Sequence, residues 1–121
     1  MKKRILVVDD DKTNLLLAEL IFIEKEYEIY KAKTGVEAIS ILKQQPIDLI
    51  LLDVMMPMMD VMKTLQMIRN NRELASIPVM FLTAAADTDT VVEACRLEVI
   101  DYVKKPFIPS DLLYRVERAF A

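Results

Sequence analysis

The stretch that decides the fold is Ile47-Asp48-Leu49-Ile50-Leu51-Leu52-Asp53. Its first six residues are apolar except for Asp48, and a run of this length suits a strand better than a helix. A nearly continuous apolar strand is typical of a parallel sheet that is covered on both faces. The stretch therefore predicts a central strand that ends in a carboxylate, Asp53.

Four further strands are expected on either side of this one. Ile5–Val8 and Val79–Leu82 are also apolar runs, and Val99–Val103 is expected to be a strand although Asp101 interrupts it. Tyr27–Ala32 instead alternates polar and apolar residues, as a half-exposed edge strand does.

Amphipathic segments separate these strands and predict five helices. Thr34 followed by Glu37 forms a capping box at the start of the second helix, and Pro109 suits the first turn of the last one. The expected helices cover about a dozen residues after Lys12, the segment after Thr34, and residues 61–70, 87–97 and 109–120.

Strands and helices that alternate in this way predict a doubly wound α/β fold, (βα)5, with a five-stranded parallel sheet and right-handed crossovers. The flavodoxin-like strand order 2-1-3-4-5 is expected because the alternating second strand belongs at an edge. The length of 121 residues fits a single domain over residues 1–121.

Composition excludes several classes of function. The chain has no histidine, which removes Ser-His-Asp and Cys-His catalysis and histidine-ligated metals. A net charge of −3 argues against nucleic-acid binding by this domain. The one cysteine, Cys95, forms no internal disulfide and is expected to be a small buried residue. No signal-like or membrane-spanning stretch is present, so we expect a cytoplasmic protein that does not bind membranes.

Polar side chains stand at the carboxyl ends of four strands, where ligands bind in open parallel sheets. These residues are Asp9 and Asp10, Asp53, Thr83 and Lys105. Three carboxylates crowded together repel one another unless a cation offsets their charge. Mg²⁺, which prefers oxygen ligands and retains several waters, is the expected ion.

Asp53 is the expected nucleophile, because carboxylates can form acyl phosphates. A transferring phosphoryl group spreads negative charge over its oxygens. The metal, Lys105, Thr83 and the backbone N–H after Thr83 would stabilise that charge. The predicted chemistry is therefore phosphoryl transfer.

Four motifs together resemble the response regulator receiver domain of two-component signalling over essentially the whole chain. Each is weak alone, whereas all four in this order are specific. They are Ile5-Leu6-Val7-Val8-Asp9-Asp10, the stretch from Leu51 to Asp60, Leu82-Thr83-Ala84, and the stretch from Asp101 to Phe107.

The resemblance implies a role for each matching residue and a cis peptide bond between Lys105 and Pro106. The implied roles are Asp53 as phosphoacceptor, Asp10 as direct metal ligand, Asp9 as ligand through water, the Met55 carbonyl as third protein ligand, Thr83 and Tyr102 as the switch pair, and Lys105 as partner of the phosphate.

The resemblance also implies a signalling switch rather than an enzyme with a separate substrate. A sensor histidine kinase or a histidine phosphotransfer protein would supply the phosphoryl group. The surface of the fourth helix, fifth strand and fifth helix would then signal to an output protein or domain, with a possible homodimer through that surface. Met55 and Ala85 cannot position an attacking water, so we expect slow self-dephosphorylation.

Plainer interpretations stay open for several residues. Asp11 is expected to cap the first helix, and Lys104 to be a solvated neighbour of Lys105. Tyr102 could be ordinary core or rim. The methionines at positions 55, 56, 58, 59 and 62 could form a soft partner surface or simply pack.

Two other classes of function compete with the switch. A receiver-like scaffold or dimerisation module would use the same fold without phosphate. A flavin carrier would need a Ser/Thr/Gly-rich loop after the first strand, and a phosphatase of the haloacid dehalogenase type would need an acid at Met55. Neither feature is present in the sequence.

The chain departs from the family pattern at its glycines. Val61 and Glu98-Val99 stand where the family usually has glycine or Gly-Ala, and Gly35 is the single glycine. A β-branched residue at positive φ is strongly disfavoured. We therefore expect the two affected loops to differ in shape from the family's.

Overall fold

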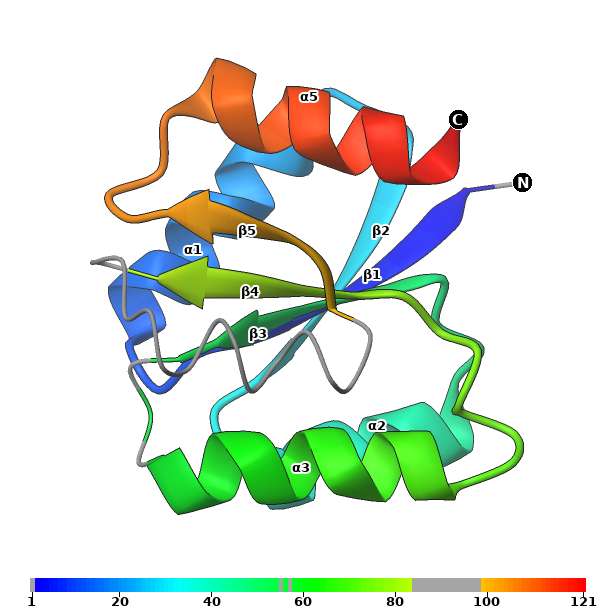
Figure 1. Cartoon of the computed structure of the whole chain (residues 1–121). Coiled ribbons are helices and arrows are strands. Elements are labelled where there is room, and N and C mark those ends of the chain that lie inside the picture. Colours follow the sequence, from blue (N-terminus) through cyan, green and yellow to red (C-terminus); the bar gives the residue numbers. More distant parts are fainter. Residues whose placement is uncertain (1, 55, 57, 84–98) are drawn as a thin grey trace.

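The computed structural model describes residues 2–54, 56, 58–83 and 99–121, with the backbone alone for 58–60. A parallel five-stranded sheet lies at the centre of the described chain, in the order β2-β1-β3-β4-β5 (Figure 1). This confirms the predicted strand order. The strands are β1 (Lys3–Val8), β2 (Tyr27–Ala32), β3 (Leu49–Asp53), β4 (Val79–Thr83) and β5 (Val99–Lys104).

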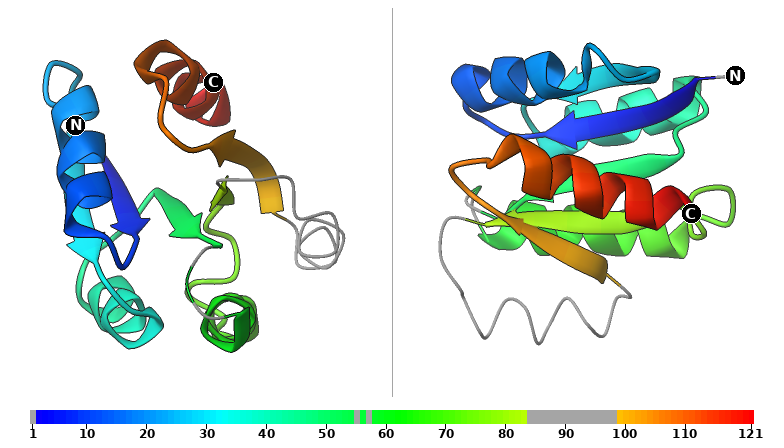
Figure 2. Two further views of the ribbon diagram at one scale, coloured as in Figure 1. Left: turned by 90° about the vertical axis from the view of Figure 1, so that its left-hand side faces the viewer. Right: turned by 90° about the horizontal axis from the view of Figure 1, so that it is seen from above.

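Helices cover both faces of the sheet (Figure 2). On one face lie α1 (Lys12–Phe22) and α5 (Pro109–Phe120); on the other lie α2 (Gly35–Gln44) and α3 (Met58–Asn70). The helix predicted over residues 87–97, together with Cys95, lies outside the described residues. The observed layers are those of a doubly wound α/β fold.

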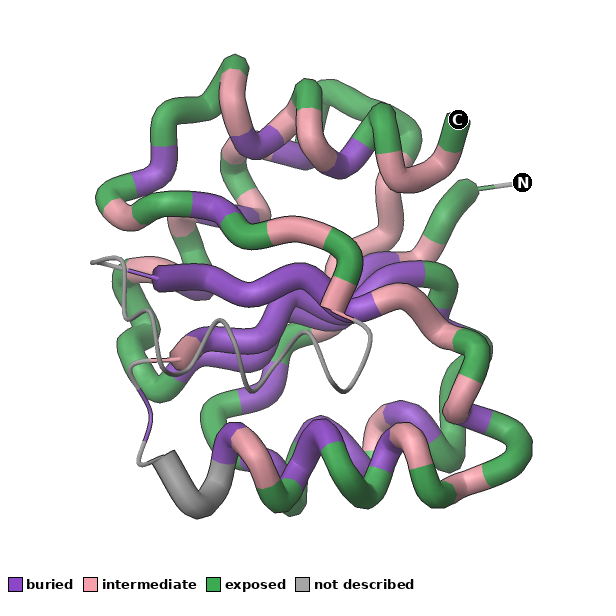
Figure 3. The backbone as a smooth tube through the Cα atoms, viewed as in Figure 1, coloured by how far each residue is buried: buried purple, intermediate pink, exposed green. Residues whose placement is uncertain are grey.

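Each face of the sheet has its own apolar core. Ile5 and Val7 of β1 pack with α1 and α5, whereas Leu6 and Val8 pack with α2 and α3. Alternate residues of a strand point to opposite faces, so a continuous apolar strand fills both cores. Figure 3 shows the resulting buried band along the central strands. Because β3 also lies between the two cores, its residues Leu49–Leu52 are all apolar.

Side chains cap the first two helices, largely as predicted. Asp11 Oδ1 accepts a hydrogen bond from the Thr13 N–H at 2.8 Å, and Thr34 Oγ1 accepts one from the Glu37 N–H at 3.1 Å. The arrangement departs from a standard capping box in one contact. The Glu37 carboxylate accepts a hydrogen bond from the Lys33 N–H at 3.0 Å, whereas in the standard motif it accepts one from the N–H of the cap residue.

The third helix begins earlier than predicted. It starts at Met58 instead of Val61, and the Val61 side chain is fully buried against the sheet. Val61 therefore has helical backbone geometry with negative φ, and no glycine is required there. Glu98, the other departure from the glycine pattern, lies outside the described residues.

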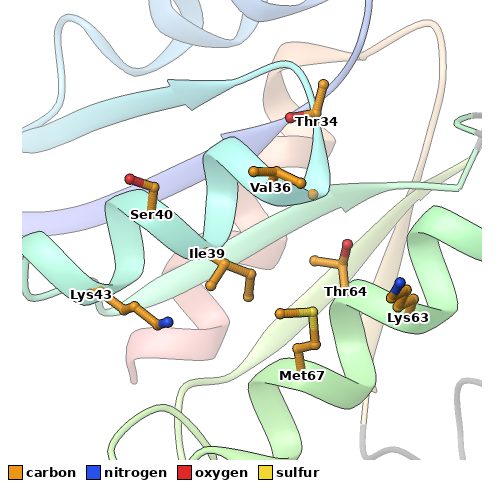
Figure 4. A pocket seen from close by; sticks show the side chains of 9 residues that line it. Thr34, Val36, Ile39, Ser40, Lys43, Lys63, Thr64 and Met67 are labelled. Atoms are coloured by element: carbon orange, nitrogen blue, oxygen red, sulfur yellow. The ribbon is translucent and has the colours of Figure 1, made fainter.

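Helices α2 and α3 approach closely at Gly35. A Cβ atom at Gly35 would overlap Thr64 Oγ1, so a side chain there would require the Thr64 side chain or one of the helices to shift. Beyond this contact the helices enclose a cleft of about 440 Å³ (Figure 4). Its lining residues are Thr34, Gly35, Val36, Ile39, Ser40, Lys43, Lys63, Thr64 and Met67.

A β-bulge shifts the register where β5 begins. Val79 pairs with Val99, but the next residue, Met80, pairs with Asp101, which leaves Ile100 as the extra residue. Val99 consequently packs with the α2 and α3 core, whereas Val103 packs with the α1 and α5 core. In a regular strand, two residues four positions apart would lie on the same face.

Candidate functional site

The residues predicted at the strand ends do lie at one edge of the sheet. Asp9 follows β1, Asp53 and Thr83 are the last residues of β3 and β4, and Lys105 follows β5. All five strands are parallel, so their carboxyl ends meet at this edge. Residues almost a hundred positions apart in sequence thereby become neighbours.

The Lys105 ammonium lies between two buried carboxylates. Its Nζ is 2.6 Å from Asp9 Oδ2 and 2.9 Å from Asp53 Oδ1. The side chains of Asp9 and Asp53 are 0% and 1% exposed, and that of Lys105 is 10% exposed. Burying an ion inside a protein costs on the order of several kcal/mol unless its partners compensate. This cluster is therefore electrostatically demanding.

Backbone contacts hold Asp9 in place. Its N–H donates to the Ala32 carbonyl at 3.0 Å, which ties the end of β1 to the end of β2. Its Oδ1 accepts from the Asp11 N–H at 2.9 Å, and its Oδ2 faces Lys105. Both carboxylate oxygens of Asp9 thus have a defined partner, and the side chain is well oriented.

Asp10 completes an acidic group with Asp9 and Asp53. One carboxylate oxygen from each of the three lies within 4.8 Å of the others, and Asp10 is exposed to solvent. Two oxygens on one Mg²⁺ lie about 3.0 Å apart when adjacent and about 4.2 Å apart when opposite, so carboxylates that share the ion directly would have to come closer together. Three carboxylates and one ammonium sum to −2. The donor set and its charge fit a divalent, oxygen-loving ion.

Thr83 is buried, and its backbone contacts Lys105 of this cluster. It is 4% exposed, and its carbonyl accepts a hydrogen bond from the Lys105 N–H at 2.8 Å. The Lys105–Pro106 peptide bond is cis, as the resemblance implies. The hydrogen bond from the Lys105 N–H anchors Lys105 to the end of β4.

Of the two remaining predicted site residues, the structure describes only Tyr102. Tyr102 lies on β5 and is 43% exposed, so it is neither core nor part of the buried group in this structure. Met55, predicted to offer its backbone carbonyl to the metal, lies outside the described residues, as do Ala84 and Ala85.

Arg115, which was not predicted as a site residue, contacts the predicted switch tyrosine. Its guanidinium carbon lies 5.8 Å from the centroid of the Tyr102 ring. It also pairs with Asp111 at 2.9 Å and with Asp101 at 2.7 Å, and these hydrogen bonds, that of Asp111 first, raise its pKa. The i, i+4 spacing of Asp111 and Arg115 predicts their pairing. No sequence pattern connects Arg115 to Tyr102.

A second polar network lies at the opposite, amino-terminal end of β1 and on β2. The Tyr30 hydroxyl donates to Glu28 Oε1 at 2.8 Å, and Arg4 Nε lies 3.2 Å from Glu28 Oε2. The Tyr30 hydrogen bond, followed by the Arg4 pairing, lowers the pKa of Glu28. The same Glu28 contact raises the pKa of Tyr30.

Sequence comparison matches residues 5–117 to the response regulator receiver domain. The chain is 38% identical, over 99% of its length, to the transcriptional regulatory protein CrdR of Helicobacter pylori and covers 56% of it. It is 32% identical, over 96% of its length, to the DNA-binding response regulator MtrA of Mycolicibacterium paratuberculosis and covers 50% of it. The chain spans about half the length of these relatives.

Solved structures agree on the fold. A response regulator from Thermotoga maritima superimposes with a TM-score of 0.88 at 26% identity, over 98% of each chain. The chemotaxis protein CheY4 of Vibrio cholerae has a TM-score of 0.91, over 98% of this chain and 99% of its own. At 24% identity, this likeness is evidence for the fold alone. Among the described helices, none has the length and apolar character needed to cross a membrane.

Proposed function

The chain belongs to the response regulator receiver domain family of two-component signalling, and from this premise we propose that Asp53 accepts a phosphoryl group from a phosphohistidine. The donor is a sensor histidine kinase or a histidine phosphotransfer protein. One observation carries the proposal: Lys105 lies between Asp9 and Asp53 beside a third carboxylate, Asp10. A buried nucleophile, a fixed cation and an oxygen-rich acidic group are what phosphoryl transfer to a carboxylate requires.

In the proposed step, an Asp53 oxygen attacks phosphorus and forms a new P–O bond. The P–N bond to the donor imidazole breaks, and its electron pair leaves with the imidazole. Lys105 is 2.9 Å from Asp53 and so is placed to bind a phosphoryl oxygen as the charge on it develops. The Thr83 hydroxyl, at the end of the adjacent strand, is proposed to donate to another.

Mg²⁺ is the proposed cofactor, with Asp10 and Asp53 as direct carboxylate ligands, Asp9 as ligand through water and the Met55 carbonyl as a further ligand. When bound, the ion supplies positive charge that offsets the acids and the transferred phosphoryl group. Support comes from the acidic group of net charge −2 once Lys105 is counted. Asp10 is its solvent-exposed member and so offers a route for the ion.

The proposed output is a shift between two populated states of the domain. Thr83 moves toward the phosphoryl group, the Tyr102 ring turns inward, and the surface around β5 and α5 changes its affinity for an output domain, an output protein or a second copy. The names of CrdR and MtrA describe transcriptional and DNA-binding regulators about twice as long as this chain. The cytoplasmic location predicted from the sequence remains part of the proposal.

Slow self-dephosphorylation is also proposed, because neither Met55 nor Ala85 can orient an attacking water by hydrogen bonding. The test compares the decay of the phosphorylated parent with that of a Met55→Asn, Ala85→Glu variant. The variant is expected to decay faster. Faster decay of the parent contradicts this part of the proposal.

The deciding experiment offers the protein phosphoramidate, whose P–N bond resembles that of phosphohistidine, with and without Mg²⁺. Mass spectrometry of the intact protein and of its peptides then measures and locates the added phosphate. We expect magnesium-dependent incorporation at Asp53 and none in Asp53→Asn. Asp11→Asn is the matched control, because it removes a nearby exposed acid and leaves a residue that can still cap α1.

Beryllofluoride separates the switch from the competing scaffold. A phosphorylation switch binds this phosphoryl mimic in the presence of Mg²⁺, and amide resonances around β5 and α5 shift. A scaffold that does not use phosphate shows neither change. Failure of both phosphoramidate and beryllofluoride to react or bind would leave the scaffold as the better interpretation.

A further inference from the structure

Arg115 of α5 contacts two neighbouring residues of strand β5, Asp101 and Tyr102. Its Nε lies 2.9 Å from Asp111 Oδ1 on its own helix, and its Nη1 lies 2.7 Å from Asp101 Oδ1 on the strand. Its guanidinium carbon lies 5.8 Å from the Tyr102 ring centroid. That distance is within the roughly 6 Å at which a guanidinium attracts an aromatic face. Two carboxylates therefore hold a cation against the ring.

Neighbouring residues of a strand point to opposite faces, so Asp101 and Tyr102 start from opposite sides of the sheet. Val103 packs into the α1 and α5 core, which places Asp101 on the same side as Arg115. Phe81, the register partner of Tyr102, packs into the α2 and α3 core. Tyr102 thus originates on the face away from α5.

The contact between Tyr102 and Arg115 is possible because β5 is an edge strand. From there the tyrosine ring can come near the guanidinium by passing around the outer side of this strand, which agrees with its 43% exposure and with the 5.8 Å contact. A ring turned inward over the sheet, on the face of Phe81, would lie away from α5 and lose this contact. The outer position with Arg115 and the inner position exclude each other.

We propose that Arg115 is a positioning residue that holds the Tyr102 ring at the outer edge of β5 in the resting protein. The inference rests on the proposed function, in which the ring turns inward when the domain is phosphorylated. Asp101 and Asp111 tie the guanidinium to the strand and to α5, so Arg115 is not free to follow the ring. Arg115 thereby sets how far the resting population favours the unphosphorylated form.

The size of the effect follows from the exposure of the pair. The Arg115 side chain is 31% exposed, and a cation–π contact at such a site changes the ratio of the two ring positions by about two- to fivefold. A ligand that binds only the inner-ring state has its apparent Kd raised by up to that factor. Removing Arg115 should therefore tighten the binding of a phosphoryl mimic.

The test uses the full chain labelled with 3-fluorotyrosine and observed by ¹⁹F NMR, with tyrosine signals assigned by single Tyr→Phe substitutions. A soluble paramagnetic reagent reports how accessible each ring is. In Arg115→Gln we expect less broadening of the Tyr102 signal, because the ring spends more time inward. Arg115→Lys, which keeps the charge, should lie between parent and Arg115→Gln.

Arg118→Gln is the matched control, since it removes an exposed arginine from the same helix. Tyr114, also exposed on α5, reports any general distortion of the helix. An unchanged Tyr102 signal in Arg115→Gln overturns the inference, as does an equal change in Tyr114 or in the Arg118→Gln protein. The ring measurement needs no ligand and is therefore decided independently of phosphorylation.

A titration with beryllofluoride at constant Mg²⁺ measures the consequence for binding. The apparent Kd is expected to fall about two- to fivefold in Arg115→Gln and to stay unchanged in Arg118→Gln. An unchanged Kd in Arg115→Gln overturns the link between ring position and binding. If the parent itself binds no beryllofluoride, the proposed function fails, while the broadening data still decide whether Arg115 positions the ring.

Discussion

Two clusters in this domain share one design, a cation between two carboxylates, but differ in burial. Lys105 lies between Asp9 and Asp53, whose side chains are at most 1% exposed. Arg115 lies between Asp101 and Asp111, which are 22% and 34% exposed. The first cluster has its charges removed from water, whereas water still screens the second.

This difference indicates what each cluster can do. In the first cluster two buried carboxylates share one ammonium, so a further cation would stabilise it, which agrees with the proposed phosphoryl transfer. An exposed pair contributes little to stability and so can be rearranged at low cost. Strong electrostatics suit the proposed reaction site, and weak electrostatics suit a movable contact.

The largest expected effect comes from breaking the buried cluster. Lys105→Met leaves Asp9 and Asp53 without their cation, so the free energy of unfolding should fall by about 3–5 kcal/mol without Mg²⁺. Urea unfolding measures this change, and added Mg²⁺ should restore part of it. The exposed neighbour provides the control, since Lys104→Met should cost no more than about 0.5 kcal/mol. Equal losses in both variants would contradict the contrast.

Magnesium should sharpen the comparison by stabilising only the buried cluster. At a concentration one hundred times its Kd, Mg²⁺ should raise the free energy of unfolding of the parent by about 2.7 kcal/mol. Asp53→Asn should lose most of that increase, while Asp11→Asn keeps it. Thermal unfolding with and without Mg²⁺ measures the difference. A parent whose midpoint ignores Mg²⁺ would count against the metal site.

Breaking the partly exposed cluster around Arg115 should have a smaller effect. Arg115→Gln removes both ion pairs and the contact with Tyr102, yet we expect the free energy of unfolding to fall by no more than about 1 kcal/mol. Urea unfolding beside Lys105→Met gives the direct comparison. A loss as large as that of Lys105→Met would show that exposure does not separate the two clusters.

Salt should change the stability cost of breaking the Arg115 cluster by roughly a few tenths of a kcal/mol, and that of breaking the Lys105 cluster by less. At about 1 M NaCl the Debye length falls to about 3 Å, which screens exposed charges and leaves buried ones largely unaffected. The cost of Arg115→Gln should therefore shrink in salt, and that of Lys105→Met should persist. Parallel urea titrations at low and high salt test this. The reverse pattern would invalidate the comparison.

The smallest effect is expected from the network at the other end of the sheet. In this network Glu28 accepts hydrogen bonds from Tyr30 and from Arg4. These bonds, that of Tyr30 first, lower the pKa of Glu28 below its ordinary value of 4.5. A lowered pKa stabilises the fold above about pH 4.5 and loses that contribution as the pH falls through the folded-state pKa.

Glu28→Gln should accordingly remove a small part of the stability that the parent loses below pH 4.5, and the two proteins should converge in acid. Urea unfolding between about pH 3 and 6 measures this difference, within the range where carboxylates titrate. Glu26→Gln, which changes an exposed glutamate just before β2, is the matched control. A parent–variant difference that grows toward low pH has the wrong sign.

Much of the site could be predicted because it depends on strand ends. Ile47–Leu52 indicated a central strand, and its last carboxylate, Asp53, had to lie at the same edge as the residues that follow the other parallel strands. The helix over Pro109–Phe120 was predicted with its observed bounds. The beginning of α3 was not, because residues 54–57 include no Ser, Thr, Asp or Asn that would mark an N-cap in the sequence.

Sequence by itself thus determined the fold, the strand order and the residues that share the carboxyl edge of the sheet. These follow from apolar patterns and from the rule that parallel strands end together. Tertiary structure alone decided the bulge at Ile100, the side of the sheet on which Val99 packs, and the contact of Arg115 with Tyr102. Such features depend on register between segments distant in the chain, which local periodicity does not encode.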